Sequence, residues 1–429
     1  MKVLIASTPA TGHLNPLLAI GRALITGGHE VAVLCASHLR DRIEGIGAAF
    51  HAFPAGADLD TREIETVFPE LKTMPPGPEM SLFYVKRVFN DQMPAQHQGL
   101  CDVLRGFPAD IILADDWLYG LLPMLLGPRS ERPPIALVGT MFLHYPRDDG
   151  APNFAGLPPA TNDDERMEYA AIFEQHEYAV YEPSRRHLNE HLANLSVKPV
   201  DVHPTVAMVS LPDAYLQLTV PSFEFPRRVL PPSVQFVGAL PIVRGQAPLP
   251  PWAEDVDGSR RVVLVSQGTV SNHDLGQLVA PTLAALADEP DILVIVTTGG
   301  RSLDTIPGPI PSNARLASYL PFDWLLPKVD AFVTNGGYGS VNQALSFGIP
   351  IVAAGQTEDK ADVSARVAWS GAGLNLATTT PEPQALRTAI RAVLDQPKYR
   401  SRAKTIAKDF ANIDTLSEIL GRLRQLATA

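Results

Sequence analysis

The first 35 residues contain a strand, a helix and a second strand, in an order that permits few folds. Residues 3–7 form an apolar run, a helical pattern covers residues 17–26 and stops at Gly27 and Gly28, and residues 30–35 form a second apolar run. Two strands joined through a helix run parallel, because the crossover returns the chain to the end of the sheet from which it started. Continuous apolar strands are typical of parallel sheets that have both faces covered. The segment therefore predicts an α/β fold built on a doubly wound parallel sheet.

The second half of the chain repeats this alternation of strands and helices. Apolar strands are predicted at residues 261–266, 292–297, 331–334 and 351–354, with helical patterns between them. The segment that precedes them is rich in proline, and a chain of 429 residues is long for one hydrophobic core. We therefore expect two doubly wound domains, with these boundaries: an N-terminal domain at 1–215, a proline-rich linker at 216–258, a C-terminal domain at 259–400, and a helical tail at 401–429 that packs back on the first domain.

The charge balance excludes several classes of partner. The chain has 35 Lys and Arg against 46 Asp and Glu, so its net charge is −11. Binding to nucleic acid or to anionic membranes depends on clustered positive charge, so neither partner is expected. The N-terminal apolar run, about six residues, is too short for a signal peptide, and no run approaches the roughly 18 residues that span a bilayer. We expect a cytoplasmic protein without stable membrane insertion.

A histidine follows the first predicted strand. His13 lies in the segment 8–16, which reads as a loop between that strand and the next helix. In doubly wound sheets, ligands bind beyond the carboxyl ends of the strands, and a histidine there can act as a general base near neutral pH. The alternative is that His13 or Asn15 only caps the helix. The loop lacks the G-x-G-x-x-G pattern, so the sequence does not favour a nicotinamide cofactor.

Two aspartates follow another predicted strand. The runs 110–114 and 135–139 read as short apolar strands, and Asp115 and Asp116 come directly after the first of them. A carboxylate at this strand end can hydrogen-bond the imidazole of His13, fix its tautomer and stabilise the imidazolium that forms when it takes a proton. The alternative for either aspartate is a helix N-cap.

A glycine-rich turn follows the strand predicted at 331–334. It reads Asn335-Gly336-Gly337-Tyr338-Gly339-Ser340 and leads into a helix. Backbone N–H groups at such a helix start, together with the helix dipole, bind phosphate oxygens. The turn is not a Walker loop, because no Gly-Lys-Ser/Thr follows. Tight packing of the strand against the helix is the alternative explanation for the glycines.

With Gln343, Gly348-Ile349-Pro350 and Glu358-Asp359-Lys360, the turn resembles the donor-site signature of the nucleotide-diphosphosugar glycosyltransferases. The chain is most similar to the group that contains plant secondary-product enzymes and bacterial macrolide and antibiotic glycosyltransferases. The resemblance covers nearly the whole chain. It implies the GT-B architecture, in which two Rossmann-like domains face a central cleft. It also implies an inverting mechanism that uses a nucleotide-sugar co-substrate and no metal or other cofactor.

The resemblance also assigns roles to individual residues. It makes His13 the catalytic base and Asp115 its partner, places the acceptor on the N-terminal domain and places the donor on the C-terminal domain. The donor-site residues that it implies are Thr11, Gly12, Gly268, Thr269, Tyr319, Leu320, Asn335, Gly336, Gly337, Tyr338, Gly339, Ser340, Gln343, Asp359 and Lys360.

Aromatic and methionine side chains in the N-terminal half are candidates for contacts with an apolar acceptor. The alternative for each is a place in the local core. The candidates are Phe83, Met93, Phe142 and Tyr145, from a wider set that includes Met74, Met80, Phe89 and Phe154.

Four positions depart from the family pattern. Asn335 replaces a histidine, Tyr319 replaces a tryptophan that stacks on the base, and Lys360 replaces a glutamine that contacts the sugar. Gln343 replaces a glutamate that binds both ribose hydroxyls. A neutral amide binds those hydroxyls less strongly than a carboxylate does, so the choice between uridine and thymidine diphosphate stays open.

The sequence thus predicts transfer of a hexose from a nucleotide diphosphate sugar, preferably a UDP-sugar, to a hydroxyl of a small hydrophobic acceptor such as a natural product. Alternatives are a nucleotide-sugar epimerase and a nucleotide-binding regulatory protein without turnover. The stretch His187-Leu-Asn-Glu-His191 has the H-x-x-E-H spacing of zinc proteases, but such short matches are common and no separate glutamate ligand is identifiable. We expect no metal site.

Overall fold

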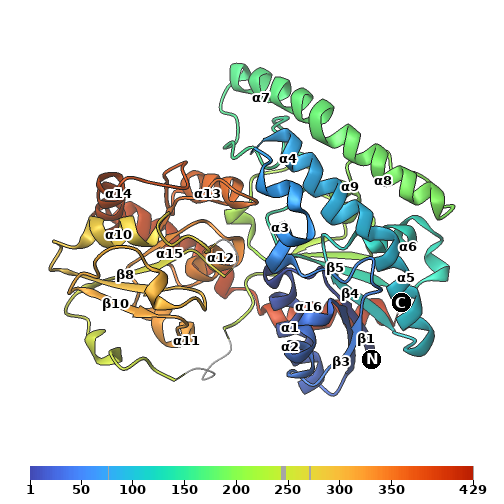
Figure 1. The fold of residues 1–429 in the computed structure, drawn as a ribbon, viewed down its shortest axis with the longest axis horizontal. Coiled ribbons are helices and arrows are strands. Elements are labelled where there is room, and N and C mark those ends of the chain that lie inside the picture. Colours follow the sequence, from blue (N-terminus) through green and yellow to red (C-terminus); the bar gives the residue numbers. More distant parts are fainter. Residues whose placement is uncertain (76, 243–247, 270–271, 429) are drawn as a thin grey trace.

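The computed structural model describes residues 1–75, 77–242, 248–269 and 272–428, which form two α/β lobes side by side (Figure 1). The first lobe contains a seven-stranded sheet in the order β3-β2-β1-β4-β5-β6-β7. Its strands are β1 (Lys2–Ala6), β2 (Glu30–Cys35), β3 (Ala49–Ala52), β4 (Ile111–Asp115), β5 (Ile135–Gly139), β6 (Ala214–Gln217) and β7 (Val234–Phe236).

The second lobe contains a six-stranded sheet in the order β10-β9-β8-β11-β12-β13. Its strands are β8 (Arg261–Ser266), β9 (Ile292–Thr297), β10 (Ala314–Ala317), β11 (Ala331–Thr334), β12 (Ile351–Ala353) and β13 (Gly373–Asn375). Every strand pair in both sheets is parallel, which confirms the predicted α/β class.

Helices surround both sheets. In the first half of the chain they are α1 (Thr11–Thr26), α2 (Arg40–Glu44), α3 (Ile64–Val67), α4 (Pro78–Phe83), α5 (Met93–Gly106), α6 (Leu122–Leu126), α7 (Asp163–His176), α8 (Glu182–Asn194) and α9 (Pro204–Ser210). In the second half they are α10 (Val279–Leu286), α11 (Phe322–Leu325), α12 (Tyr338–Ser346), α13 (Lys360–Trp369), α14 (Pro383–Asp395), α15 (Pro397–Ala411) and α16 (Thr415–Ala427). Among the described residues, no helix is both long and apolar enough to cross a membrane.

The burial of β1 explains its continuous apolar sequence. Val3 and Ile5 pack in one core with α1 and α16, whereas Leu4 and Ala6 pack in another core on the opposite face of the sheet. Alternate side chains of a strand point to opposite faces, so a strand covered on both sides needs apolar residues at every position. Because β1 and β4 pair in parallel, with Ala6 opposite Ala114, their carboxyl ends lie together.

The first helix begins earlier than the sequence predicts. It starts at Thr11 and contains Pro16, so the predicted start at residue 17 is wrong. Proline is common in the first turn of a helix, where its missing N–H would have no partner within the helix. Here Pro16 lies further inside, and the helix loses only the backbone hydrogen bond to the carbonyl of Gly12. The N-cap is Ala10, without a side-chain cap, so neither His13 nor Asn15 has the capping role considered above.

Two of the predicted boundaries need correction. The segment 216–258 is not only a linker, because β7 lies within it and β6 ends in it, and both extend the first sheet. Strands of four and three residues between prolines give a weak sequence signal, and prolines are tolerated near a sheet edge.

The segment 401–429 divides between the two lobes. Helix α15 packs in the second lobe through Ala403, Ile406 and Phe410. Helix α16 packs in the first lobe through Ile419 and Leu423. The prediction that this whole segment packs on the first domain is therefore wrong for α15.

Candidate active site

Three strand ends of the first sheet place polar side chains next to one another. His13 lies in the first turns of α1, directly after β1. Asp115 is the last residue of β4, and Thr140 follows the last residue of β5. Since β4 pairs with both β1 and β5, these residues lie at one edge of the sheet although they are far apart in the sequence.

His13 and Asp115 are in direct contact. The distance from His13 Nδ1 to Asp115 Oδ1 is 3.1 Å, and the Asp115 side chain is completely buried. Asp115 also accepts hydrogen bonds from the backbone N–H groups of Thr8, at 2.6 Å, and Trp117, at 2.9 Å. A carboxylate can only accept, so this contact assigns the Nδ1 hydrogen of His13 to Asp115 and leaves the lone pair on Nε2.

The environment of His13 shifts its pKa upward. Burial lowers the pKa of the imidazole, but the hydrogen bond and the charge of Asp115, together with the charge of Asp116, outweigh it. The pKa of His13 therefore lies above its ordinary value of 6.5. A base with a raised pKa holds a transferred proton more firmly, at the cost of being protonated over a wider pH range.

Asp116 approaches His13 through Thr140. The Thr140 hydroxyl donates to Asp116 Oδ1 at 2.9 Å, and its oxygen lies 3.0 Å from His13 Nδ1. The hydroxyl of Tyr215 donates to Asp116 Oδ2 at 2.9 Å. The sequence did not identify Thr140; its only signal is its position one residue after the apolar strand 135–139.

Across from this edge, the second lobe presents the glycine-rich turn. Gly336 has a φ of +91°, and a Cβ there would lie 2.7 Å from Ser364 Oγ, so the position requires glycine. Helix α12 starts at Tyr338 with Gly337 as its N-cap and no side-chain cap, and the space around Gly339 is open. The first N–H groups of a helix have no partner within it, so this start can bind an anion.

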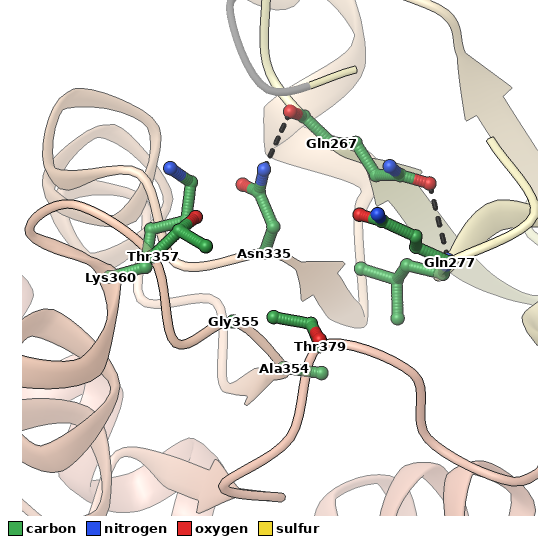
Figure 2. Close-up of a pocket in the computed structure, with 9 residues that line it drawn as sticks. Gln267, Gln277, Asn335, Ala354, Gly355, Thr357, Lys360 and Thr379 are labelled. Carbon is green, nitrogen blue, oxygen red and sulfur yellow. Dashed lines mark hydrogen bonds between the residues drawn. The ribbon is translucent and has the colours of Figure 1, made fainter. Parts of the chain in front are cut away.

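The Ser340 and Asn335 side chains make contacts within the protein. The Ser340 hydroxyl donates to the carbonyl of Gly337 at 2.9 Å, so its hydrogen is used inside the turn. The Asn335 amide donates to the carbonyl of Gln267 at 2.7 Å, as Figure 2 shows. Asn335 therefore joins the glycine-rich turn to the Gly268 loop, a role that the sequence did not indicate.

A small, open pocket lies between these loops. Figure 2 shows Lys360 and Thr357 on one side of Asn335, with Gln267 and Gln277 on the other. The residues that line it are Gln267, Gln277, Leu278, Asn335, Ala354, Gly355, Thr357, Lys360 and Thr379. Burial lowers the pKa of Lys360 to about 8, and its amine pairs with Glu358. At neutral pH the pocket thus has a largely protonated amine at its wall.

Asp359 connects the two halves of the site electrostatically. Desolvation raises the pKa of Asp359 to about 6, while the charge of His13 lowers it. The charge of Asp359 in turn contributes to the raised pKa of His13. The structure therefore brings His13 and Asp115 of the first lobe near Asp359 of the second lobe, which hydrogen-bonds the backbone of Tyr338 in the glycine-rich turn.

Other predicted residues lie at the edges of this arrangement or outside it. Tyr319 is 67% exposed and lies against Gly300, where a Cβ would come within 2.3 Å of its hydroxyl. Thr269 is exposed, and Gln343 is half-buried on α12. Met93 and Phe142 are fully buried in cores, so the structure favours the core alternative for both. Phe83 and Tyr145 are half-buried.

Aromatic rings cluster around Trp117, the residue after Asp116. Trp117 lies 4.6 Å from the ring of Phe89 and 6.0 Å from that of Phe154, between ring centroids. Phe89 and Phe154 are only partly buried, and both belong to the wider set of acceptor candidates. Partly buried rings of this kind suit an acceptor with a large hydrophobic surface.

Comparison with known proteins identifies relatives over the whole chain. Residues 281–426 match the family model for the C-terminal domain of erythromycin biosynthesis protein CIII-like proteins. The chain is 37% identical to UDP-glycosyltransferase 2 of Phaeomoniella chlamydospora, covering 100% of this chain and 96% of the relative. It is 35% identical to 4'-demethylrebeccamycin synthase of Lentzea aerocolonigenes, covering 99% of both.

A solved structure has the same architecture. The calicheamicin glycosyltransferase CalG4 superimposes with a TM-score of 0.73, covering 99% of this chain and 98% of that one at 20% identity. This likeness confirms the expected GT-B fold, with its two α/β domains.

Proposed function

This chain belongs to the UDP-glycosyltransferase family of GT-B natural-product glycosyltransferases, and we propose that it transfers a hexose, with inversion, from a uridine diphosphate sugar to a hydroxyl of a small hydrophobic acceptor. The observation that carries this proposal is the contact between His13 and Asp115, 3.1 Å long, at a sheet edge that faces the glycine-rich turn. Family membership sets aside the epimerase and the non-catalytic alternatives.

His13 acts as the general base in this proposal. Asp115 accepts a hydrogen bond from the Nδ1 hydrogen of His13, so the Nε2 of His13 is free to take the proton of the acceptor hydroxyl. The acceptor oxygen forms a bond to the anomeric carbon while the bond from that carbon to the diphosphate oxygen breaks. The electron pair leaves with the nucleotide diphosphate, the anomeric centre inverts, and the new imidazolium is stabilised by Asp115.

The leaving diphosphate is stabilised by fixed donors in the second lobe. They are the N–H groups at the start of α12 and the protonated amine of Lys360, which borders the same pocket. One preorganised donor of this kind is typically worth about 3 kcal/mol in the transition state. These donors replace a metal ion, so turnover after exhaustive EDTA treatment should be the same with and without added Mg²⁺. A loss of turnover that Mg²⁺ restores would contradict this part of the proposal.

The acceptor lies against the first lobe, beside His13. The partly buried rings of Phe89 and Phe154 around Trp117 favour an aromatic or polycyclic acceptor. A relative at 35% identity is named for synthesis of a rebeccamycin, which supports a natural-product acceptor for this chain as well.

The test is an assay of purified protein with UDP-glucose and a panel of hydroxylated polycyclic acceptors. We expect UDP release only when an acceptor is present, in a 1:1 ratio with a glycoside whose anomeric configuration is opposite to that of the donor. Retained configuration would exclude a single displacement at the anomeric carbon with His13 as the base. Conversion of the donor to an epimer without an acceptor would contradict transfer itself.

A further inference from the structure

The two histidines of the H-x-x-E-H stretch face a carboxylate that the sequence did not identify. His187 and His191 lie on α8, at the outer edge of the first lobe (Figure 1). Residues four apart on a helix share a face, and here that face is turned toward Asp91, in the short helical turn Asn90–Gln92 that precedes α5. This cluster lies apart from His13 and is not used by the proposed reaction.

The three side chains converge on one point. Asp91 Oδ1 lies 2.6 Å from His187 Nε2 and 3.0 Å from His191 Nε2. The two imidazole rings are 4.9 Å apart between centroids, at an angle of 84°. One oxygen and two imidazole nitrogens thus lie within 4.8 Å of one another, an arrangement that can hold a metal ion.

Groups around the cluster hold two of its members in place. Arg87 Nη1 donates to Asp91 Oδ2 at 2.5 Å, so the carboxylate is fixed through the oxygen that does not contact the histidines. Glu190 Oε2 lies 3.8 Å from His187 Nδ1. Metal-binding histidines typically direct their second nitrogen to a carboxylate, and metal-binding carboxylates are themselves hydrogen-bonded.

We propose that Asp91, His187 and His191 bind one Zn²⁺ ion, or a similar divalent transition metal, with water as the fourth ligand. Two imidazole nitrogens and one carboxylate oxygen are ligands that zinc takes in a tetrahedral site. On binding, each imidazole hydrogen moves from Nε2 to Nδ1, so both Nε2 lone pairs face the ion and Asp91 exchanges two hydrogen bonds for one metal bond. The side chains are 20 to 25% exposed, so the ion reaches the site from solvent without unfolding.

The metal has a structural role, because its ligands link α8 to the helical turn Asn90–Gln92. The neighbouring Asn90 side chain already donates to the carbonyl of Ser184 at 2.9 Å across the same contact. Phe89, the residue before Asn90, packs against Trp117, which follows the Asp115–Asp116 pair. Bound zinc therefore stiffens the wall of the proposed acceptor site and raises the stability of the first lobe without entering the chemistry of transfer.

The experiment titrates Zn²⁺ into protein freed of metal by EDTA and dialysis, with calorimetry for stoichiometry and thermal unfolding for stability. Wild type should bind one ion per chain and unfold at a temperature several degrees higher with zinc. The double variant His187→Gln/His191→Gln should bind zinc more than tenfold more weakly and lose the thermal shift. Glutamine keeps an amide that can donate to Asp91, so the variant is expected to fold. His273→Gln, at an exposed histidine of the second lobe, is the matched control and should behave as wild type.

A second measurement does not depend on any variant. Wild type loaded with Co²⁺ should show the intense visible absorption of a four-coordinate site with nitrogen and oxygen ligands. The weak spectrum of octahedral cobalt, or zinc binding in wild type no tighter than in the double variant, would overturn the proposal. An equal loss of zinc affinity in the His273→Gln control would also overturn it, since the zinc would then be bound by scattered surface histidines. None of these outcomes depends on turnover, so they are independent of the proposed transferase activity.

Discussion

The guanidinium of Arg366 on α13 lies 2.6 Å from the carboxylate of Glu224, and both side chains are completely or almost completely buried. Glu224 follows β6 of the first sheet, so the pair joins the two lobes. Burial raises the pKa of Glu224, but the charges of Arg366 and Arg227 outweigh it and hold that pKa at about 2. The rings of Phe142 and Phe225 lie 4.4 and 4.0 Å from the Arg366 guanidinium carbon.

Glu224→Gln should therefore destabilise the protein strongly. The change removes the carboxylate that both Arg366 and Arg227 contact and leaves Arg366 with the longer pair to Asp362, at 3.5 Å. Loss of one partner of a buried ion pair typically costs about 3–5 kcal/mol. Glu44→Gln, in a pair with Arg40 whose side chains are 55% and 50% exposed, is the control and should cost well under about 1 kcal/mol. Urea unfolding of both variants measures the difference. Equal losses of unfolding free energy would mean that the buried Glu224–Arg366 pair stabilises the protein no more than the exposed pair does.

The same pair predicts a pH dependence of stability. The folded-state pKa of Glu224 is depressed to about 2, below its ordinary 4.5. Its contribution is present above pH 4.5 and is lost as the pH falls toward 2. Wild type should therefore lose more unfolding free energy between these values than Glu224→Gln does. A variant that follows the wild-type slope would assign the acid sensitivity to other carboxylates.

Asp115→Asn should slow transfer more than Asp116→Asn. Asp115 contacts His13 directly, whereas Asp116 reaches it only through Thr140. Loss of the carboxylate should also lower the pKa of His13, since Asp115 contributes the most among the groups that raise it. The pH profile of kcat/KM measures both effects. In wild type, kcat/KM should fall as the pH is lowered, with a midpoint above pH 6.5. The midpoint for Asp115→Asn should lie at a lower pH. A larger effect from Asp116→Asn would move the partner role to that residue.

Thr140→Val should reduce turnover about fivefold to tenfold. The change removes a hydroxyl that lies 3.0 Å from His13 Nδ1 and donates to Asp116, and a single hydrogen bond is worth about 1 kcal/mol. Thr140→Ser keeps the hydroxyl and should restore turnover. If serine fails to rescue, the effect of valine comes from packing and not from the position of the imidazole.

Much of the fold could be predicted because the strands are apolar at every position. The runs 30–35, 135–139, 261–266 and 292–297 coincide with β2, β5, β8 and β9. Short strands near prolines give no such signal, so the predicted linker at 216–258 includes β7 and the second half of β6. Pro16 concealed the true start of α1, because a proline inside a helix and one at its start look alike in a single sequence.

The candidate site was partly predictable for a different reason. His13 and Asp115 lie at the carboxyl ends of predicted strands, and the carboxyl ends of parallel strands meet at one edge of the sheet. Their proximity could therefore be inferred before the fold was known. Thr140 also follows a strand, but a threonine there gives no sign of a chemical role. Asp91 follows no predicted strand, so only the tertiary structure brings it to His187 and His191. The roles of the donor-site residues stay predictions.

Gln343→Glu should tighten binding of uridine diphosphate more than that of thymidine diphosphate. Gln343 lies three residues after Ser340 on α12, so it shares that face of the helix and points toward the ribose when Ser340 lies at the phosphates. A carboxylate binds the 2′ hydroxyl more strongly than an amide does, with an expected gain of about 1 kcal/mol. Competition binding of both nucleotides to wild type and variant is the measurement. Equal changes would show that residue 343 does not contact the 2′ hydroxyl.

The role of His13 as the base is the central claim, and His13→Ala tests it most directly. Loss of a general base typically slows turnover about 100-fold to 10,000-fold, whereas most of the predicted nucleotide-binding residues lie on the other lobe. Turnover with a competent donor and acceptor and calorimetric binding of uridine diphosphate should be measured on the same preparation. The account predicts a loss of turnover in that range with nucleotide affinity unchanged. Near-normal turnover in His13→Ala would contradict it.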